Sequence, residues 1–500
     1  MIDTISRRVR RAAALSAALV AALILALITA PAAHAAPQPA GPFTIEITKL
    51  EQPDALGQPA NGLPIADAAA ISPPVPDAEF SAWRVPGVDL STNAGQQQAA
   101  LLTPEAAAAL VDTSSVPDAR DITDNDGEAT LDGLAIGIYY VAETSVPAGF
   151  VGSAPFLVAL PLTNPVSLDG WLDTVHIYPK NSRVGIELQV FDANSVKLGD
   201  VVEWLSRSDI PNSGPIDGYR VEQQIDPKLR LLSGPGDIAV TLSGTGAPAL
   251  VEGTHYTLSV DPATQLITID FLPTGRTLLS QFVGAHPGAK VDIGYRTEVQ
   301  DLGELTNRSL LYPSRAAIDA APGSPAPPSA TATTKWGALA AVVHERGNPS
   351  NLIRGAKFKL YLSEADARSG TNPIEVAGMS EWTSDAQGLL RIDGLRLSNF
   401  ANGLDRDQSD PLYRYYYLAP VFFPAGWTGD TSPIRTTVTS TTQVNVLEVL
   451  LWRSGGGGGL PSTGAQMTGA AIVAALLIGA GVLFFLRRRR AEDEEETTNS

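Results

Sequence analysis

Apolar and polar residues alternate in many short segments of this chain, and turn residues separate the segments. Residues 43–50, 265–271 and 290–299 show the alternation most clearly. Such a pattern predicts strands with one buried face. Gly, Pro, Asn and Asp lie between the segments, as in Asp124-Asn-Asp-Gly127, because these residue types suit turns. The pattern therefore predicts an all-β protein made of immunoglobulin-like β-sandwiches.

Motifs from the first part of the chain return near its end, which suggests three tandem domains. We expect an N-terminal domain over residues 36–181, a different middle domain over 182–318, and a repeat of the first over 335–453. Residues 319–334 are rich in Ala, Pro, Ser and Thr, so we expect a linker there. The repeated motifs are Asp77-Ala-Glu-Phe80 with Gly355-Ala-Lys-Phe358, Asp124-Asn-Asp-Gly127 with Asp385-Ala-Gln-Gly388, and Tyr139-Tyr-Val-Ala with Tyr416-Tyr-Leu-Ala.

Both ends of the chain carry apolar segments with basic flanks. Arginines between positions 7 and 11 precede an apolar run and Ala33-His34-Ala35, which is typical of a secretory signal peptide over residues 1–35. Near the other end, residues 465–486 are uncharged and long enough to span a bilayer as a helix. Four arginines, 487–490, follow that segment. By the positive-inside rule, the C-terminal end of the segment therefore lies in the cytoplasm. We therefore expect everything between the two segments to lie outside the cell.

The composition argues against several classes of function. The chain has no cysteine, so it forms no disulfide, thiol nucleophile or thiolate metal site. Its net charge of −18 argues against nucleic acid as a partner. Its five histidines are scattered, and it contains no Gly-x-Ser-x-Gly, phosphate-binding loop, metal-ligand cluster or twelve-residue calcium loop. We expect no enzyme activity, no metal and no cofactor, although turns rich in Asp and Asn leave a bound calcium ion open.

A five-residue motif stands directly before the apolar segment at the C-terminal end. A glycine run, residues 455–459, precedes it as an expected flexible spacer. The motif, the apolar span and the basic end together resemble the cell-wall sorting signal of Gram-positive surface proteins over residues 454–500. The resemblance implies that a sortase cleaves after Thr463, holds it as a thioacyl intermediate and passes it to an amine. The motif consists of Leu460, Pro461, Ser462, Thr463 and Gly464.

Further motifs resemble the major shaft pilins of Gram-positive bacteria over nearly the whole chain. The resemblance implies Cna-type β-sandwich domains, with a Cna B-like fold in the first and third. It also implies that Lys180, in the motif Tyr178-Pro179-Lys180, is the amine that attacks Thr463 of the next copy. The motifs that carry the resemblance are His176-Ile-Tyr-Pro-Lys-Asn181, Asp192-Ala-Asn-Ser-Val-Lys-Leu-Gly-Asp200, Asp209-Ile-Pro-Asn212 and Thr334-Lys-Trp-Gly337.

The same resemblance implies a set of partners. They are a class C pilin sortase, a housekeeping sortase, copies of the chain in a head-to-tail fibre, and peptidoglycan, while minor pilins and a host or surface ligand stay open.

Lysine is scarce in this chain, which makes each candidate amine informative, because an amine nucleophile must be one of eight lysines. The lysines are Lys49, Lys180, Lys197, Lys228, Lys290, Lys335, Lys357 and Lys359.

Shaft pilins usually carry internal Lys–Asn isopeptide bonds, which need a lysine on an early strand, an asparagine on a late strand and a carboxyl between them. In the middle domain Asn307 matches, but no lysine lies near residue 188 and no aspartate near residue 223. In the C-terminal domain residues 337–344 contain no lysine, and Pro420 stands at the expected glutamate. We therefore expect no internal bond in these two domains.

The N-terminal domain keeps all three residue types, in Lys49, Glu143 and Asn181. Burial would favour the neutral amine and the protonated carboxyl, so that lysine and asparagine can condense. Two readings stay open for this domain. Either Glu143 shuttles protons for a Lys49–Asn181 bond, or Lys49 is a surface residue of its strand that pairs with Glu143.

Two functions remain open for the whole chain. The first is a structural subunit of a covalently polymerised pilus (fimbria) that is anchored to peptidoglycan and supports adhesion. The alternative is a wall-anchored monomeric adhesin or minor pilin with the same modules. The motif Tyr178-Pro179-Lys180 favours the first, whereas the missing internal-bond residues favour the second, because a shaft under load profits from cross-links.

Overall fold

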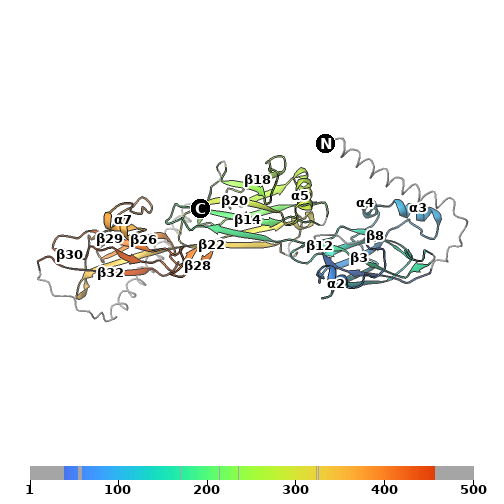
Figure 1. Cartoon of the computed structure of the whole chain (residues 1–500), viewed down its shortest axis with the longest axis horizontal. Coiled ribbons are helices and arrows are strands. Elements are labelled where there is room, and N and C mark those ends of the chain that lie inside the picture. The colour runs from blue at the N-terminus through green and yellow to red at the C-terminus, as the bar shows by residue number, and fades with distance from the viewer. Residues whose placement is uncertain are drawn as a thin grey trace, which may run out of the picture.

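The computed structural model describes residues 39–455, apart from residues 54–58, 169, 213, 233, 235, 322, 323 and 325. Three bodies built mostly of strands lie in a row and form an elongated rod (Figure 1). We call them D1 (residues 43–183), D2 (184–336) and D3 (337–453). The expected signal peptide, sorting motif and apolar span lie outside the described residues. Within those residues, no helix combines the length and apolar character that crossing a membrane requires.

D1 is a sandwich of two main sheets, in the orders β11-β1-β5 and β4-β3-β6-β8. Phe43, Ile45 and Ile47 alternate inward from the first strand and pack with Phe80 and Val141 from the opposite sheet. The strand predicted from this alternation is therefore confirmed. The strands are β1 (Phe43–Thr48), β2 (Leu50–Glu51), β3 (Glu79–Arg84), β4 (Ala119–Ile122), β5 (Glu128–Leu134), β6 (Gly137–Ser145), β7 (Phe150–Val151), β8 (Phe156–Leu160), β9 (Leu162–Thr163), β10 (Trp171–Leu172), β11 (Thr174–Ile177) and β12 (Lys180–Arg183), and the helices are α2 (Ala68–Ile71), α3 (Asn93–Leu101) and α4 (Pro104–Ala108).

D2 has the largest core, in which the rings of Trp204 and Tyr295 stack with their centroids 6.1 Å apart. One of its two sheets contains β13, β14, β20, β16 and β17, and the other runs β18-β19-β15-β21 and ends at β22 (Ser329–Glu345). Its elements are β13 (Ile186–Phe191), β14 (Val201–Asp209), β15 (Arg220–Gln224), β16 (Leu229–Leu232), β17 (Ile238–Leu242), β18 (Tyr256–Val260), β19 (Ile267–Phe271), α5 (Pro273–Ala285), β20 (Lys290–Val299), β21 (Gly303–Tyr312) and α6 (Arg315–Ile318).

Helix α5 was missed in the sequence, although the chain carries signals for it. Pro273 stands in its first turn, where a missing N–H costs nothing, and Leu279, Phe282 and Val283 are buried at helical spacing. The surrounding alternation of strands hid this 3.6-residue period.

D3 repeats the sandwich of D1 with an apolar core that includes Leu339, Phe358 and Leu418. One sheet is centred on β22, which pairs with β23, β26 and β32, and the other runs β25-β24-β29-β31. Its elements are β22 (Ser329–Glu345), β23 (Asn348–Leu352), β24 (Lys357–Tyr361), α7 (Glu364–Ser369), β25 (Trp382–Thr383), β26 (Leu389–Arg396), β27 (Phe400–Ala401), β28 (Leu404–Asp405), β29 (Tyr416–Phe422), β30 (Trp427–Gly429), β31 (Ile434–Thr436) and β32 (Asn445–Arg453).

A repeated turn fixes which residues of D1 and D3 correspond. Gly127 and Gly388 end this turn with positive φ values of 74° and 65°. A Cβ on Gly127 would lie 2.4 Å from the backbone oxygen of Lys49, and one on Gly388 would lie 2.4 Å from that of Val343. Only glycine both adopts a positive φ without strain and leaves room for the nearby backbone oxygen. Lys49 and Val343 therefore occupy equivalent positions in the two domains.

The linker predicted over residues 319–334 is wrong for residues 329–334. These residues form the first part of β22, which pairs with β21 of D2 and continues without a break into D3. The Ala/Thr-rich composition looks like that of a linker, but β-branched threonines suit a strand, and β21 supplies hydrogen-bond partners for the backbone. D2 and D3 are thus joined by one continuous strand, which is visible in yellow in Figure 1.

A loop of D2 strengthens this junction. The buried carboxylate of Asp192 accepts hydrogen bonds from the Thr334 hydroxyl (2.5 Å) and the Asn402 backbone N–H (2.6 Å). The Asn402 side-chain oxygen accepts a bond from the Asp192 N–H in return (3.0 Å). The fully buried guanidinium of Arg396 donates to the backbone oxygen of Ser195 (3.2 Å). Hydrogen bonds between buried polar groups of the two domains therefore hold D2 and D3 together.

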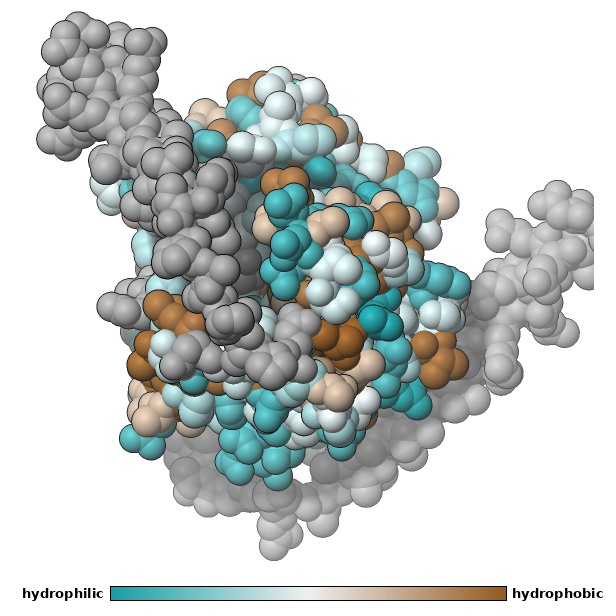
Figure 2. Space-filling view, turned by 90° about the vertical axis from the view of Figure 1, so that its right-hand side faces the viewer, coloured by the Kyte–Doolittle hydropathy of each residue, from teal (hydrophilic) through white to brown (hydrophobic). Residues whose placement is uncertain are grey.

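Figure 2 views the molecule from the D1 end of the rod. Apolar areas there lie apart from one another between polar ones, in the part of this face that is not covered by grey atoms. Exposed apolar side chains of D1 include Leu101, Leu110 and Val116. Scattered exposed apolar residues are normal for a protein surface, so the described residues visible in this view form no broad apolar docking face.

Candidate functional site

The candidate site is built around the short strand β12 at the end of D1. This strand runs parallel to β2, with Lys180 opposite Leu50 and Asn181 opposite Glu51. Successive side chains of a strand point to opposite faces. Asn181 is fully buried, whereas Lys180 remains partly exposed. The strand therefore presents an amide to the core and an amine to the surface.

On the inner face, one carboxylate bridges an amine and an amide. Oε2 of Glu143 lies 2.8 Å from Nζ of Lys49, and its Oε1 accepts a hydrogen bond of 2.6 Å from Nδ2 of Asn181. The side chains of Lys49 and Glu143 are 0% and 1% exposed. The structure thus brings together the three residues of D1 that the sequence singled out, and it places Lys49 in the core rather than at the surface.

Two further residues at this cluster were not found in the sequence. Ser153 donates to Oε2 of Glu143 through its backbone N–H (2.9 Å) and also contacts Nζ of Lys49 with its hydroxyl (3.1 Å). The ring of Phe80 lies 5.1 Å from the same Nζ. Phe80 itself could have been found, because it is the apolar residue that ends the repeated motif Asp77-Ala-Glu-Phe80. Nothing in the sequence marked Ser153, because its role depends on a loop that returns to β6.

Burial changes the acid–base properties of the amine. It lowers the pKa of Lys49 from 10.5 to about 8, because a charged ammonium is poorly solvated in the core, although the charge of Glu143 opposes the shift. About a tenth of Lys49 is therefore the neutral, nucleophilic amine at pH 7, far more than an exposed lysine would have. The amide oxygen of Asn181 has no hydrogen-bond partner among the described residues. The cluster thus holds an activated amine beside an amide that is incompletely satisfied.

On the outer face, the backbone holds Lys180 in a fixed place. The C=O of Pro179 accepts a hydrogen bond from the N–H of Leu50 (3.1 Å), and the hydroxyl of Tyr178 accepts one from the N–H of Ile65 (2.5 Å). Nζ of Lys180 donates only to the backbone oxygen of Tyr178 (3.2 Å) among the interactions found in the described chain. Pro179 restricts the backbone directly before the lysine.

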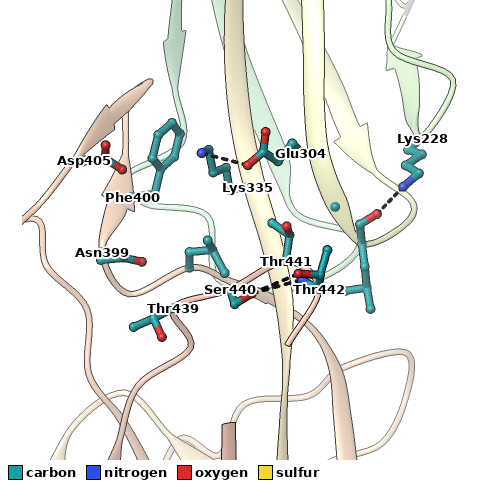
Figure 3. A pocket seen from close by; sticks show the side chains of 13 residues that line it. Lys228, Glu304, Lys335, Asn399, Phe400, Asp405, Thr439, Ser440, Thr441 and Thr442 are labelled. Carbon is teal, nitrogen blue, oxygen red and sulfur yellow. Dashed lines mark hydrogen bonds and ion pairs between the residues drawn. The ribbon is translucent and has the colours of Figure 1, made fainter. Parts of the chain in front are cut away.

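Most other lysines are engaged with carboxylates. Lys197 pairs with Asp200, Lys290 with Asp209, and Lys357 with Glu381. A cleft of about 650 Å³ between D2 and D3 contains two more, Lys335 and Lys228 (Figure 3). Lys335 points toward Glu304, 2.9 Å away, and Lys228 donates to the backbone oxygen of Leu302 at 2.6 Å. This cleft therefore holds lysines that are already bound to their own chain.

D3 replaces each member of the D1 cluster with a residue that has no reactive side chain. Lys49 corresponds to Val343 through the shared turn. Glu143 pairs with Phe80 in D1 just as Pro420 pairs with Phe358 in D3. Asn181 corresponds to Leu451, because β32 lies beside β22 as β12 lies beside β2. The strand pairs that show this are Leu50↔Lys180, Glu51↔Asn181, His344↔Leu450 and Glu345↔Leu451.

D2 lacks the cluster in a different way. Leu188 and Gln223 are buried at the two positions where a lysine and an aspartate were expected. The side chain of Asn307 accepts a hydrogen bond from the N–H of Asp226 (2.9 Å) and donates one to the hydroxyl of Tyr295 (3.2 Å). Lys49 is the one buried lysine of the eight, all of which lie in the described part of the chain. No amine is therefore available to Asn307.

Comparison with known proteins identifies the N-terminal end of the described rod and the tail of the chain. Residues 43–182 match the family model of the Gram-positive pilin subunit D1, N-terminal domain. Residues 454–493 match the LPXTG cell wall anchor motif. Fimbrial subunit type 2 of Actinomyces naeslundii is 28% identical over 395 residues, covering 71% of this chain and 72% of that protein. Together these matches support a Gram-positive pilin subunit with an LPXTG cell-wall anchor.

A second fimbrial subunit is similar to this chain in sequence, and two solved pilin structures are similar to it in fold. Fimbrial subunit type 1 of Actinomyces viscosus is 27% identical over 456 residues, covering 81% of this chain and 83% of that protein. The full-length major pilin SpaD of Corynebacterium diphtheriae shares the fold with a TM-score of 0.63 at 22% identity, over 83% of this chain and 97% of that one. The major pilin SpaA of the same organism gives 0.58 at 22%, over 82% and 100%.

These matches bear on the general role and the location of the pilin. Its relatives are structural fimbrial subunits rather than enzymes. The anchor motif places it on the cell wall at the bacterial surface. Among residues 39–455, where the structure describes them, no group of three His, Asp or Glu side chains is arranged to hold a metal ion. The three-domain Cna-type fold implied by the sequence is confirmed.

Proposed function

We propose that the pilin polymerises through an amide bond between Lys180 of one copy and Thr463 of the next. The observation that carries this proposal is the state of Lys180, which is fixed by its backbone, reachable from solvent and free of any carboxylate partner among the described residues. An amine nucleophile in an ion pair would first have to give up that pair. Tyr178 and Pro179 complete the motif by fixing the chain before the lysine.

The chemistry of this joint balances as an acyl transfer. A pilin sortase of class C cleaves the Thr463–Gly464 peptide bond and holds the Thr463 carbonyl as a thioester on its cysteine. The neutral amine of Lys180 attacks that carbonyl carbon, the new C–N bond forms, and the sulfur leaves as the thiolate. The amine loses its proton before attack, which desolvation in the enzyme cleft favours. A housekeeping sortase then transfers the last subunit to peptidoglycan, and the finished fibre supports adhesion.

Inside D1, the buried cluster supports a second amide bond, between Lys49 and Asn181. The neutral amine of Lys49 attacks Cγ of Asn181, the C–N bond forms, and Nδ2 leaves as ammonia. Glu143 contacts both nitrogens, so it can take the proton from the attacking amine and give it to the leaving one. This bond would fasten β12, the strand that carries Lys180, to the start of the domain.

Cell-wall extracts of bacteria that express the wild type or Lys180→Ala test the intermolecular joint. A blot against the pilin should show a ladder of high-mass species for the wild type and only the monomer for the variant. Lys228→Ala is the matched control, because Lys228 is also exposed and lacks a carboxylate partner. A ladder that survives Lys180→Ala would refute the assignment. The absence of a ladder in the wild type would favour the wall-anchored monomeric adhesin or minor pilin.

A further inference from the structure

The path of a pulling force through the rod follows from where the chain is joined, so this inference rests on the proposed Lys180–Thr463 joint. Force transmitted through that joint enters at Lys180 and leaves beyond Arg453. The residues of D1 before Lys180 form a side branch that carries no tension along its backbone. The tension passes through D2 and D3, which are the two domains without a Lys–Asn cluster.

The first and last strands of D3 meet this force in a particular geometry. Residues 339–345 of β22 pair in parallel with residues 445–451 of β32. Force enters β22 at its N-terminal end and leaves β32 at its C-terminal end. In a parallel pair these are opposite ends of the ladder, so the force loads all of its hydrogen bonds together in shear. The pair therefore resists low tension as a unit and yields only when the whole ladder fails.

No covalent link can bypass this ladder in D3. The positions that hold Lys49, Glu143 and Asn181 in D1 hold Val343, Pro420 and Leu451 in D3. Val343 and Leu451 are fully buried and contribute to the apolar core. This packing stabilises the domain at equilibrium, but it offers no bond that survives once the two strands separate.

We propose that D3 is an extensible element of the fibre. Above a threshold tension β22 and β32 shear apart, and the chain between Leu339 and Leu451 unfolds. The roughly 110 residues released would lengthen the subunit by about 350–400 Å, given a reach of about 3.3–3.6 Å per residue. Each extension lowers the tension on the remaining joints. Below the threshold the continuous strand β22 keeps D2 and D3 a stiff unit.

A reversible staple across the ladder gives a direct test. Val342 and Glu448 face each other in adjacent strands, one half-buried and one exposed. The chain has no cysteine, so Val342→Cys with Glu448→Cys creates a unique pair. Paired residues of neighbouring strands lie about 5 Å apart, which is within the range of a disulfide. When oxidised, it passes tension from β22 straight to β32. The control pair, Glu46→Cys with Thr130→Cys, joins β1 to β5 in D1, outside the force path.

The experiment uses single-molecule force spectroscopy on residues 36–459 with DNA handles attached through azide-bearing amino acids at positions 180 and 459. The unstapled protein should show an event of about 350–400 Å. That event should vanish in the oxidised D3 staple, return with dithiothreitol, and persist in the oxidised D1 control. Absence of the event in the unstapled protein, or its persistence in a D3 staple shown by mass to be oxidised, would overturn the proposal. The handles need no sortase, so failure of the Lys180 joint in cells would be recognised separately.

Discussion

Lys180 and Asn181 are consecutive residues of β12 whose side chains point to opposite faces of D1. Asn181 lies in the core against Glu143, and Lys180 lies at the surface. The alternation of the strand prevents either residue from taking the place of the other. Two amide bonds are thus proposed to leave from one strand, one into the domain and one to the next subunit, and substitutions can separate them.

We predict that Asn181→Ala removes the internal bond and leaves polymerisation through Lys180 intact. The purified wild-type ectodomain should be lighter than its sequence mass by one molecule of ammonia, and the variant should have the full mass. D1 of the variant should also be less stable by about 5 kcal/mol, by analogy with other cross-links that close a loop of this length. Intact-mass spectrometry and thermal unfolding measure the two effects.

Asn307→Ala is the matched control for this prediction. Asn307 is as buried as Asn181, but its amide contacts Asp226 and Tyr295 instead of a lysine. The control should therefore keep the mass deficit. A wild type of full mass would show that the cluster in D1 does not condense.

We predict that Glu143→Gln also yields a protein of full mass, because the amide cannot shuttle protons between Lys49 and Asn181. It should be more harmful to D1 than loss of the bond alone. Lys49 would be left in the core without a counter-charge, and breaking a buried pair in this way costs about 3–5 kcal/mol. Lys49→Met combined with Glu143→Leu should recover much of that stability, as the apolar residues of D3 suggest. Urea unfolding that ranks the double variant below Glu143→Gln would contradict this account.

The fold was largely readable from the sequence because alternation and turn residues act locally. The strand that contains Phe43, Ile45 and Ile47 and the turn that ends at Gly127 were both predicted correctly. Residues 329–334 were not, because their strand exists only through pairing with β21. Helix α5 was hidden for a similar reason, since its signals are weak beside those of the neighbouring strands. Local patterns thus predicted elements, and long-range pairing decided the exceptions.

The candidate site was only partly readable. Lys49, Glu143 and Asn181 were found by residue type and order, but the sequence did not decide whether Lys49 is buried. Lys49 lies directly after β1 and continues its inward alternation, and its burial depends on Phe80 and on the loop that carries Ser153. The apolar residue that replaces Asn181 in D3, Leu451, became recognisable only from the register of β22 and β32.

We predict that Asp192→Ala uncouples D2 from D3. The substitution leaves the Thr334 hydroxyl and the Asn402 N–H buried without their acceptor, at a cost of about 1–3 kcal/mol for each group. In calorimetry, D3 should then unfold at a lower temperature and apart from D2. Asp405→Ala, an exposed carboxylate on β28, is the control and should change neither transition. Unaltered calorimetric transitions in Asp192→Ala would mean that the continuous strand alone couples the domains.

We predict that D1 becomes more stable as the pH rises from 8 to about 10 when the internal bond is absent. In Asn181→Ala the amine of Lys49 stays free, with a pKa of about 8 in the folded state and 10.5 in the unfolded state. Below pH 8 both states carry the proton. Above pH 8 only the unfolded state keeps it, so the free energy of unfolding rises with pH. The full gain for a difference of this size is about 3 kcal/mol.

Other groups that titrate in this range act in the opposite direction. Burial raises the pKa of Tyr139 and Tyr140, so their contribution to stability is lost as the pH rises above their unfolded value near 10. The double variant Lys49→Met/Asn181→Ala keeps these tyrosines and lacks the amine. Unfolding in urea, followed by a dye on Thr130→Cys in β5, measures D1 in both proteins. The difference between the two should grow with pH between 8 and 10, and a constant difference would show that Lys49 keeps an ordinary pKa in the core.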